Sequence, residues 1–141
     1  MSEYQYYEFQ AIDRPLTSRQ MGELRKLYAL AFAVFVGRSL LKKGGGGSDM
    51  IEVAALGKPC CFGPYTANFV EVVEMLTQQG DGGKGAVEVK DATDLTRVVG
   101  GWLAEPEGAA AMGRRAQELI RIQQEARATD RYVERLLQLV Q

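Results

Sequence analysis

A glycine-rich loop between two short apolar segments constrains the fold of this chain more than any other feature. The apolar segments are residues 32–36 and 59–62, and four consecutive glycines, 44–47, lie between them. Short apolar runs bounded by turn residues predict buried strands. Ser48 can cap a helix after the glycines, and Gly57 can end it. The stretch therefore predicts a strand, a glycine loop, a short helix and a second strand, in that order.

The rest of the chain continues the alternation of helices and strands. Thr17 and Gln20 form a capping-box pattern, and Asn68 and Asp91 are placed to cap two further helices. The predicted helices are residues 18–30, 49–56, 68–78, 91–103, 109–126 and 130–139, and the predicted strands are 32–36, 59–62 and 86–89. Such alternation predicts an α/β fold with right-handed crossovers. We expect a small Rossmann-like parallel sheet of about three strands, with flanking helices and a helical C-terminus.

The loops that follow the first two predicted strands are best placed to bind a ligand. In an open parallel sheet, ligands bind beyond the carboxyl ends of the strands. Loops 37–48 and 63–68 both leave the sheet at that edge. The first also enters a helix, where unpaired N–H groups favour an anion such as phosphate. It matches neither the dinucleotide fingerprint nor the Walker loop, so a flexible loop with glycines for tight turns remains the alternative.

Composition excludes several classes of function. The 141 residues carry a net charge of −1, and no Lys/Arg run exceeds the pair Lys42 and Lys43, so no nucleic-acid partner is expected. The apolar run 27–36 is shorter than the ~20 residues of a membrane-spanning helix. The chain has no histidine, which excludes histidine-based nucleophile systems and metal sites. Adjacent Cys60 and Cys61 are expected to be reduced core residues on opposite faces of a strand.

Three stretches resemble the C-terminal half of bacterial 3-deoxy-D-manno-octulosonic acid (Kdo) transferases. Residues 35–40 are similar to Phe-Val-Gly-Gly-Ser-Leu of that family, and residues 62–69 to its Phe-Gly-Pro-His-Thr-Phe-Asn-Phe. Residues 46–59 are similar to Gly-Gly-His-Asn-Pro-Leu-Glu-Pro-Ala-Ala-Leu-Gly-Lys-Pro. The resemblance begins at Met21. It implies an incomplete Rossmann-like domain, namely the C-terminal half of a B-type glycosyltransferase that acts in lipopolysaccharide synthesis.

The resemblance also implies a binding site for CMP-Kdo or CMP. The first loop would lie along the nucleotide, Glu52 would accept hydrogen bonds from the ribose hydroxyls, and Asn68 would support the pocket from the second loop. The residues so implied are Ser39, Gly46, Gly47, Ser48, Asp49, Glu52 and Asn68. No cofactor, metal ligand or catalytic residue is expected within this chain.

The chain departs from the family in its site and in its extent. Ser48 and Asp49 stand where the family commonly has His-Asn, and Tyr65 stands where it commonly has His. By this resemblance we expect the chain to lack the acceptor half, which carries the family's catalytic carboxylate base. Residues 1–18 weakly resemble the opening of another, uncharacterised bacterial family. We therefore expect residues 1–18 to be a non-family extension and residues 19–141 to be a partial donor-binding domain.

Two functions follow from these expectations. The chain is either a donor domain that needs a protein supplying the missing N-terminal half, or a non-catalytic interaction module or gene remnant with an unpaired sheet edge. The location expected is the cytoplasm, at the inner face of the inner membrane by resemblance. The carboxylate pairs Asp91 with Asp94 and Glu71 with Glu74 are more typical of caps and solvated faces than of a hydrolase.

Overall fold

The computed structural model describes residues 17–42 and 49–140. The helices are α1 (Ser18–Leu30), α2 (Ile51–Ala55), the 3-10 helix η1 (Ala67–Phe69), α3 (Val70–Thr77), α4 (Ala92–Ala104) and α5 (Pro106–Val140), and the strands are β1 (Val34–Val36), β2 (Cys60–Phe62) and β3 (Val87–Glu88). Helices and strands alternate as predicted, with shorter strands. The predicted extension at residues 1–18 lies almost wholly outside the described residues.

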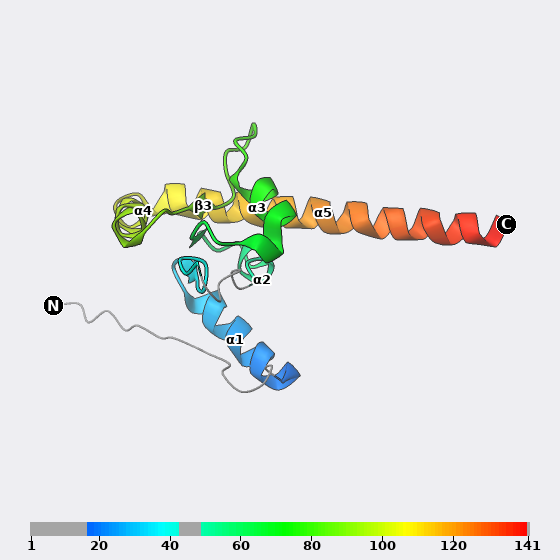
Figure 1. The fold of residues 1–141 in the computed structure, drawn as a ribbon, viewed down its shortest axis with the longest axis horizontal. Helices are drawn as coiled ribbons and strands as arrows, with labels where there is room; N and C mark the ends of the chain where they lie inside the picture. Colours follow the sequence, from blue (N-terminus) through cyan, green and yellow to red (C-terminus); the bar gives the residue numbers. More distant parts are fainter. Residues whose placement is uncertain (1–16, 43–48, 141) are drawn as a thin grey trace.

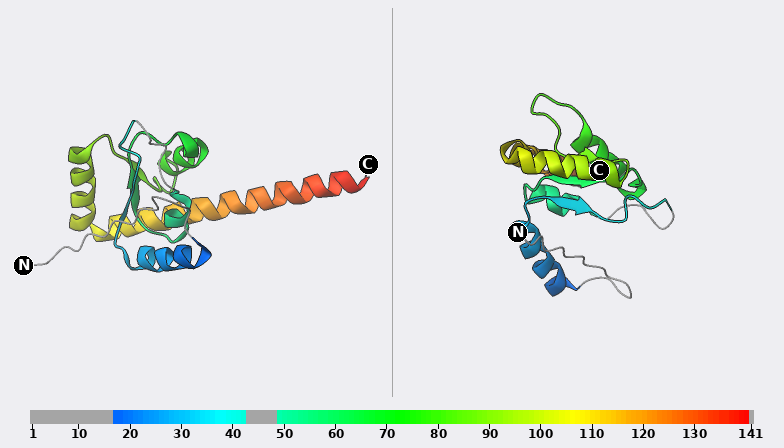
Figure 2. Two further views of the ribbon diagram at one scale, coloured as in Figure 1. Left: turned by 60° about the horizontal axis from the view of Figure 1, so that its bottom comes forward. Right: turned by 90° about the vertical axis from the view of Figure 1, so that its left-hand side faces the viewer.

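The three strands form one parallel sheet in the order β1-β2-β3. β1 pairs with β2 from Val34 opposite Cys60 to Val36 opposite Phe62, and β3 pairs with the last two residues of β2. Figure 2 shows α1 on one side of the sheet and α4 on the other. The prediction of a small parallel sheet with flanking helices is confirmed.

The starts of α1 and α4 follow the predicted capping patterns. Thr17 and Gln20 form a complete capping box, in which each side chain bonds to the other residue's backbone N–H. At α4, Asp91 Oδ1 accepts a hydrogen bond from Asp94 N at 2.8 Å. Such caps satisfy N–H groups that have no partner within the helix, so both helix starts are set by local sequence.

The predicted cap at Asn68 is wrong. Asn68 is the middle residue of η1, and α3 begins after Phe69 without a side-chain cap hydrogen bond. Instead, Phe69 N donates to Thr66 O at 2.9 Å, which forms the tight turn typical of a 3-10 helix. The Asn68 side chain is exposed at the surface.

The central strand β2 is buried on both faces. Cys60 and Phe62 belong to a core cluster with residues of α2, α3 and α5, whereas Cys61 belongs to a second cluster with Trp102 of α4 and Ala109 of α5. Burial raises the pKa of both thiols to about 12. The two cysteines are free, and they lie on opposite faces as predicted.

The C-terminal region forms one helix, where two had been predicted. α5 runs unbroken from Pro106 to Val140. The predicted break at residues 126–130 contains no glycine or proline, and the Thr129 hydroxyl donates to Glu125 O at 3.0 Å within the helix. Figure 1 shows α5 extending far beyond the sheet. No helix of the described residues is both long and apolar enough to cross a membrane.

Two glycines let α5 approach the end of α2. Gly57 has φ +70 and follows α2, as predicted for a residue that ends a helix. A β-carbon on Gly113 of α5 would overlap the carbonyl group of Gly57. The backbones therefore meet directly at this point, and the Gln117 side chain adds a hydrogen bond from Nε2 to Ala55 O at 2.9 Å.

We expect Gly113→Ala to destabilise the fold by about 1–3 kcal/mol, because the added methyl group overpacks this contact. Gly100→Ala in α4 is the matched control, since a β-carbon there meets no atom within 4 Å. The control should gain about 0.5–1 kcal/mol of stability from higher helix propensity. Urea unfolding followed by circular dichroism measures both changes; equal gains for the two variants would contradict the close approach.

Candidate functional site

Ser39 joins the loops that leave the carboxyl ends of β1 and β2. Its side chain is fully buried. The hydroxyl donates to Val36 O at 2.6 Å and accepts from Gly63 N at 2.8 Å. Ser39 O also accepts from Tyr65 N at 2.9 Å. The observed role of Ser39 is thus to hold the two loops together, and its predicted place along a nucleotide stays a prediction.

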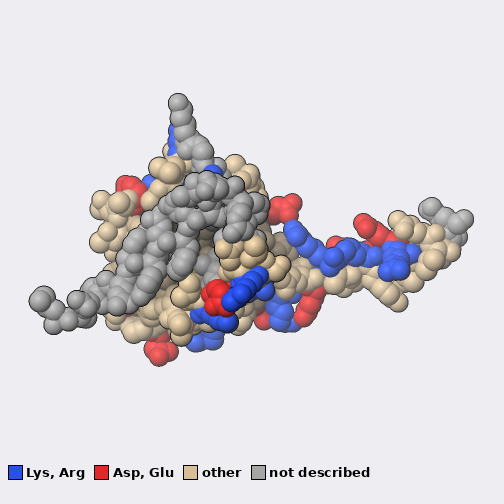
Figure 3. Space-filling model, turned by 90° about the horizontal axis from the view of Figure 1, so that it is seen from below, with Lys and Arg blue, Asp and Glu red and all other residues tan. Residues whose placement is uncertain are grey.

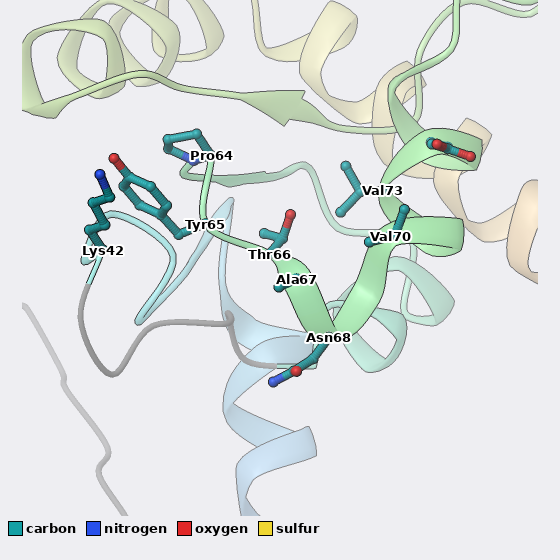
Figure 4. A pocket seen from close by; sticks show the side chains of 9 residues that line it. Lys42, Pro64, Tyr65, Thr66, Ala67, Asn68, Val70 and Val73 are labelled. Atoms are coloured by element: carbon teal, nitrogen blue, oxygen red, sulfur yellow. The ribbon is translucent and has the colours of Figure 1, made fainter.

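An open pocket of about 500 Å³ lies at this edge of the sheet. Its volume falls within the range of roughly 300–1,000 Å³ common for small-molecule sites. Figure 4 shows Lys42 and Tyr65 at one end of the pocket and Val70 and Val73 at the other, with Asn68 below them. The lining residues are Lys42, Pro64, Tyr65, Thr66, Ala67, Asn68, Val70, Val73 and Glu74.

The pocket contains one predicted site residue and several that sequence reasoning missed. Asn68 was predicted, whereas Lys42, Thr66 and Glu74 were not. Lys42 follows β1 and the other two follow β2, so their meeting depends on the parallel pairing of these strands. The loops after two adjacent parallel strands lie at one edge of the sheet. This rule could have predicted that residues after β1 and β2 line one pocket.

The start of α2 contributes a second group of predicted residues. The N-cap of α2 is Met50, so the predicted cap at Ser48 is wrong; Asp49, one residue before Met50, accepts a hydrogen bond at Oδ1 from Ile51 N at 2.8 Å. Ser48, Gly46 and Gly47 lie outside the described residues. α2 spans only Ile51–Ala55, which is shorter than the predicted helix 49–56.

Glu52 lies at the contact between α2 and α1. Its Oε1 forms an ion pair with Arg25 Nη2 at 2.8 Å, and 20% of its side chain is exposed. Tyr28, also on α1, has its pKa raised by burial and by the nearby carboxylates of Glu52 and Asp49. The fold thus brings the predicted site residues Glu52 and Asp49 together beside α1. The sequence had predicted no partner on α1 for either carboxylate.

The chemistry of these groups suits binding better than covalent catalysis. The pocket offers an aromatic ring from Tyr65, an ammonium group from Lys42 and an amide from Asn68. Aromatic rings stack on nucleobases, and cations and amides bind anions and polar atoms. The buried cysteines stay protonated at neutral pH because their pKa values are about 12, so neither is an activated nucleophile.

Comparison with known proteins gives one relative and one solved structure. No protein-family model matches the chain. The chain is 34% identical over 101 residues to a 3-deoxy-D-manno-octulosonic acid transferase of Haemophilus influenzae, a match that covers 71% of this chain and 22% of the relative. The crystal structure of the C-terminal CMP-Kdo binding domain of WaaA from Acinetobacter baumannii matches with a TM-score of 0.62 and 31% identity, covering 71% of this chain and 49% of that domain.

The match therefore extends over most of this chain but only about a fifth of the transferase and half of the solved domain. The sequence match and the structural match each cover 71% of this chain. The chain is a partial glycosyltransferase-like domain, related to the C-terminal half of Kdo transferases.

Proposed function

We propose that the joined loops after β1 and β2 bind the nucleotide part of CMP-Kdo. The observation that carries this proposal is the pocket at the carboxyl edge of the sheet, within a region similar to a CMP-Kdo binding domain. Ligands of open α/β sheets bind at this edge.

The assignments within the site follow from the chemistry of each group. Tyr65 offers its ring to the base, and Asn68 supports the pocket wall. Gly46, Gly47, Ser48 and Asp49 lie along the phosphate, because the backbone N–H groups of a glycine loop suit an anion. Glu52 accepts hydrogen bonds from the ribose hydroxyls, since a carboxylate suits a vicinal diol.

We expect Glu52→Ala to weaken CMP binding by about 10- to 100-fold, measured by isothermal titration, because losing hydrogen bonds to a charged group removes about 1.5–3 kcal/mol. The same substitution also breaks the ion pair with Arg25. Arg25→Ala breaks that pair while leaving the carboxylate, so it should retain most of the affinity. Glu118→Ala removes a carboxylate paired with Arg121 on α5 and is the control for charge alone.

The titration can contradict the assignment in two ways. Equal affinity of wild type and Glu52→Ala would exclude Glu52 from the site. Equal losses in Glu52→Ala and Arg25→Ala would show that the ion pair positions α2, and that the carboxylate does not contact ribose.

Sugar transfer requires groups beyond those proposed for this chain. The acceptor hydroxyl must lose its proton to a base within roughly 2.6–3.2 Å. Glu52 is assigned to ribose, several bonds from the anomeric carbon. Asp49 already accepts a hydrogen bond from Ile51 N at the start of α2. We therefore propose that transfer depends on a protein that supplies the N-terminal half, at the cytoplasmic face of the inner membrane.

We expect the isolated chain to transfer no Kdo to a lipid A precursor. A base contributes typically ~10²–10⁴-fold to rate, and positioning of the acceptor contributes up to ~7–11 kcal/mol. The assay supplies CMP-Kdo generated in situ and detects modified lipid by mass spectrometry. Product above the no-protein background would show that the chain has its own base and acceptor site.

The projecting part of α5 supports a docking surface for this partner. Figure 3 shows charged side chains of both signs gathered along this part of the helix, with uncharged surface beside them. Several large apolar side chains there are exposed, and Leu139 is 78% exposed. The exposed residues of this apolar stripe are Ile122, Tyr132, Val133, Leu136, Leu137 and Leu139. Exposed apolar patches of this kind mark interaction sites, and we propose that the stripe docks the protein that supplies the N-terminal half.

We expect the chain to form a 1:1 complex with the N-terminal half of the Haemophilus influenzae transferase, measured by size exclusion with light scattering. The double variant Leu136→Glu, Leu137→Glu should lose the complex while keeping its unfolding midpoint, because both side chains are exposed. Gln138→Glu adds a charge on the face of α5 opposite the stripe and should not affect the complex. If the wild-type chain stays a monomer when it is mixed with the N-terminal half, or forms only a homodimer, the proposed partner is wrong.

A further inference from the structure

The pocket at the carboxyl edge of the sheet carries charged groups of both signs. Lys42 lines it from the loop after β1, and Glu74 lines it from α3. Both residues are exposed. Figure 4 places Lys42 at the end of the pocket opposite Val70 and Val73 of α3, and Glu74 is the next residue of that helix. The ammonium and the carboxylate therefore reach the pocket from two separate walls.

The ammonium group of Lys42 is unpaired in the described part of the chain. No hydrogen bond or ion pair joins it to residues 17–42 or 49–140, whereas the guanidinium groups of Arg25 and Arg97 are each paired with a carboxylate. A lysine ammonium has three N–H donors and no acceptor, so an anion suits it as a partner. Binding an anion here would break no interaction of the described fold.

Tyr65 lies at the same end of the pocket as Lys42 (Figure 4). Its backbone is tied to the loop that carries Lys42, because Tyr65 N donates to Ser39 O at 2.9 Å. Ser39 is fully buried and precedes Lys42 in the same loop. An aromatic ring and an ammonium group therefore come together at one end of the pocket. They match the two chemical parts of a nucleotide, a flat base and an anionic phosphate.

We propose that the Lys42 ammonium binds the anionic group of the nucleotide, and this inference rests on the proposed function. Lysine binds phosphate as a point charge. The Glu74 carboxylate would repel an anion placed beside it. The two charges therefore favour one orientation of the ligand, with its anionic group at the Lys42 end of the pocket. A CMP-linked acidic sugar carries a phosphodiester and a sugar carboxylate, and both are anions that suit an ammonium.

The test removes the charge of Lys42 and keeps most of the length of its side chain. Lys42→Gln is compared with Lys42→Arg, which keeps a positive charge, and with Lys84→Gln. Lys84 is an exposed lysine in the loop before β3, at the opposite edge of the parallel sheet, so its variant controls for net charge alone. Each protein is titrated with cytidine, with CMP and with CMP-N-acetylneuraminic acid, a CMP-linked acidic sugar, and its unfolding midpoint is measured.

We expect Lys42→Gln to bind CMP about fivefold more weakly than wild type, or about 1 kcal/mol, with cytidine binding and the unfolding midpoint unchanged. Lys42→Arg and Lys84→Gln should bind CMP as the wild type does. The difference between Lys42→Gln and wild type should shrink as the salt concentration is raised from about 0.05 to 0.5 M, because salt screens the attraction between exposed charges.

The outcomes distinguish the anion that is bound and the level at which the inference fails. A loss already seen with CMP assigns Lys42 to the phosphate, and a loss confined to the acidic sugar nucleotide assigns it to the carboxylate. Wild-type affinity of Lys42→Gln for all three ligands would overturn the role of Lys42 and leave the proposed site in place. Equal losses for cytidine and CMP, or an equal loss of CMP affinity in Lys84→Gln, would also overturn that role. Absence of CMP binding by the wild type would overturn the proposed function and this inference together.

Discussion

The candidate site depends first on the buried hydrogen bonds of Ser39. A buried hydroxyl must find partners, because an unpaired polar group in the interior costs about 1–3 kcal/mol. Ser39 finds them in Val36 O, within its own turn, and in Gly63 N of the next loop. A β-carbon on Gly63 would overlap the backbone carbonyl of Ser39, so the close contact between the two loops requires glycine at position 63. This contact sets the distance between the loops, and the pocket formed by Lys42 and residues 64–74 follows from it.

A second constraint fixes the layers around the sheet. β2 is fully buried and separates two core clusters, one with α2, α3 and α5 and the other with α4. α5 contributes to both clusters through Ala109, Ala116 and Ile120. Its close approach to Gly57 then places α2, and α2 positions Asp49 and Glu52. The carboxylates proposed to meet the ligand are therefore held by packing on the opposite side of α2, against α5.

Structure that depends on nearby residues could be predicted from the sequence, whereas contacts between distant residues could not. The starts of α1 and α4 follow from side chains three residues apart, as Thr17 with Gln20 and Asp91 with Asp94 show. The fold class could also be predicted from the sequence, because an alternation of helices and strands is compatible with few topologies. The partner of Glu52 is Arg25, 27 residues away, and no local pattern names it. The unbroken α5 was missed because Thr129 and Asp130 suit helix starts, although nothing between them and Gly113 stops a helix.

The edge of the sheet at β1 explains why this fold resembles a part of a larger one. β2 has a neighbour on each side, but β1 has only β2 among the described strands. Its Phe35 is 37% exposed, and Phe32 and Leu30 beside it are exposed as well. An edge strand with exposed apolar residues is suited to pair with a further strand. The match covers 71% of this chain and 49% of the solved CMP-Kdo binding domain, so the sheet described here corresponds to part of that domain. The two core clusters lie on opposite faces of β2, and the hydrogen bonds of Ser39 hold the loops after β1 and β2 together at one edge of this sheet.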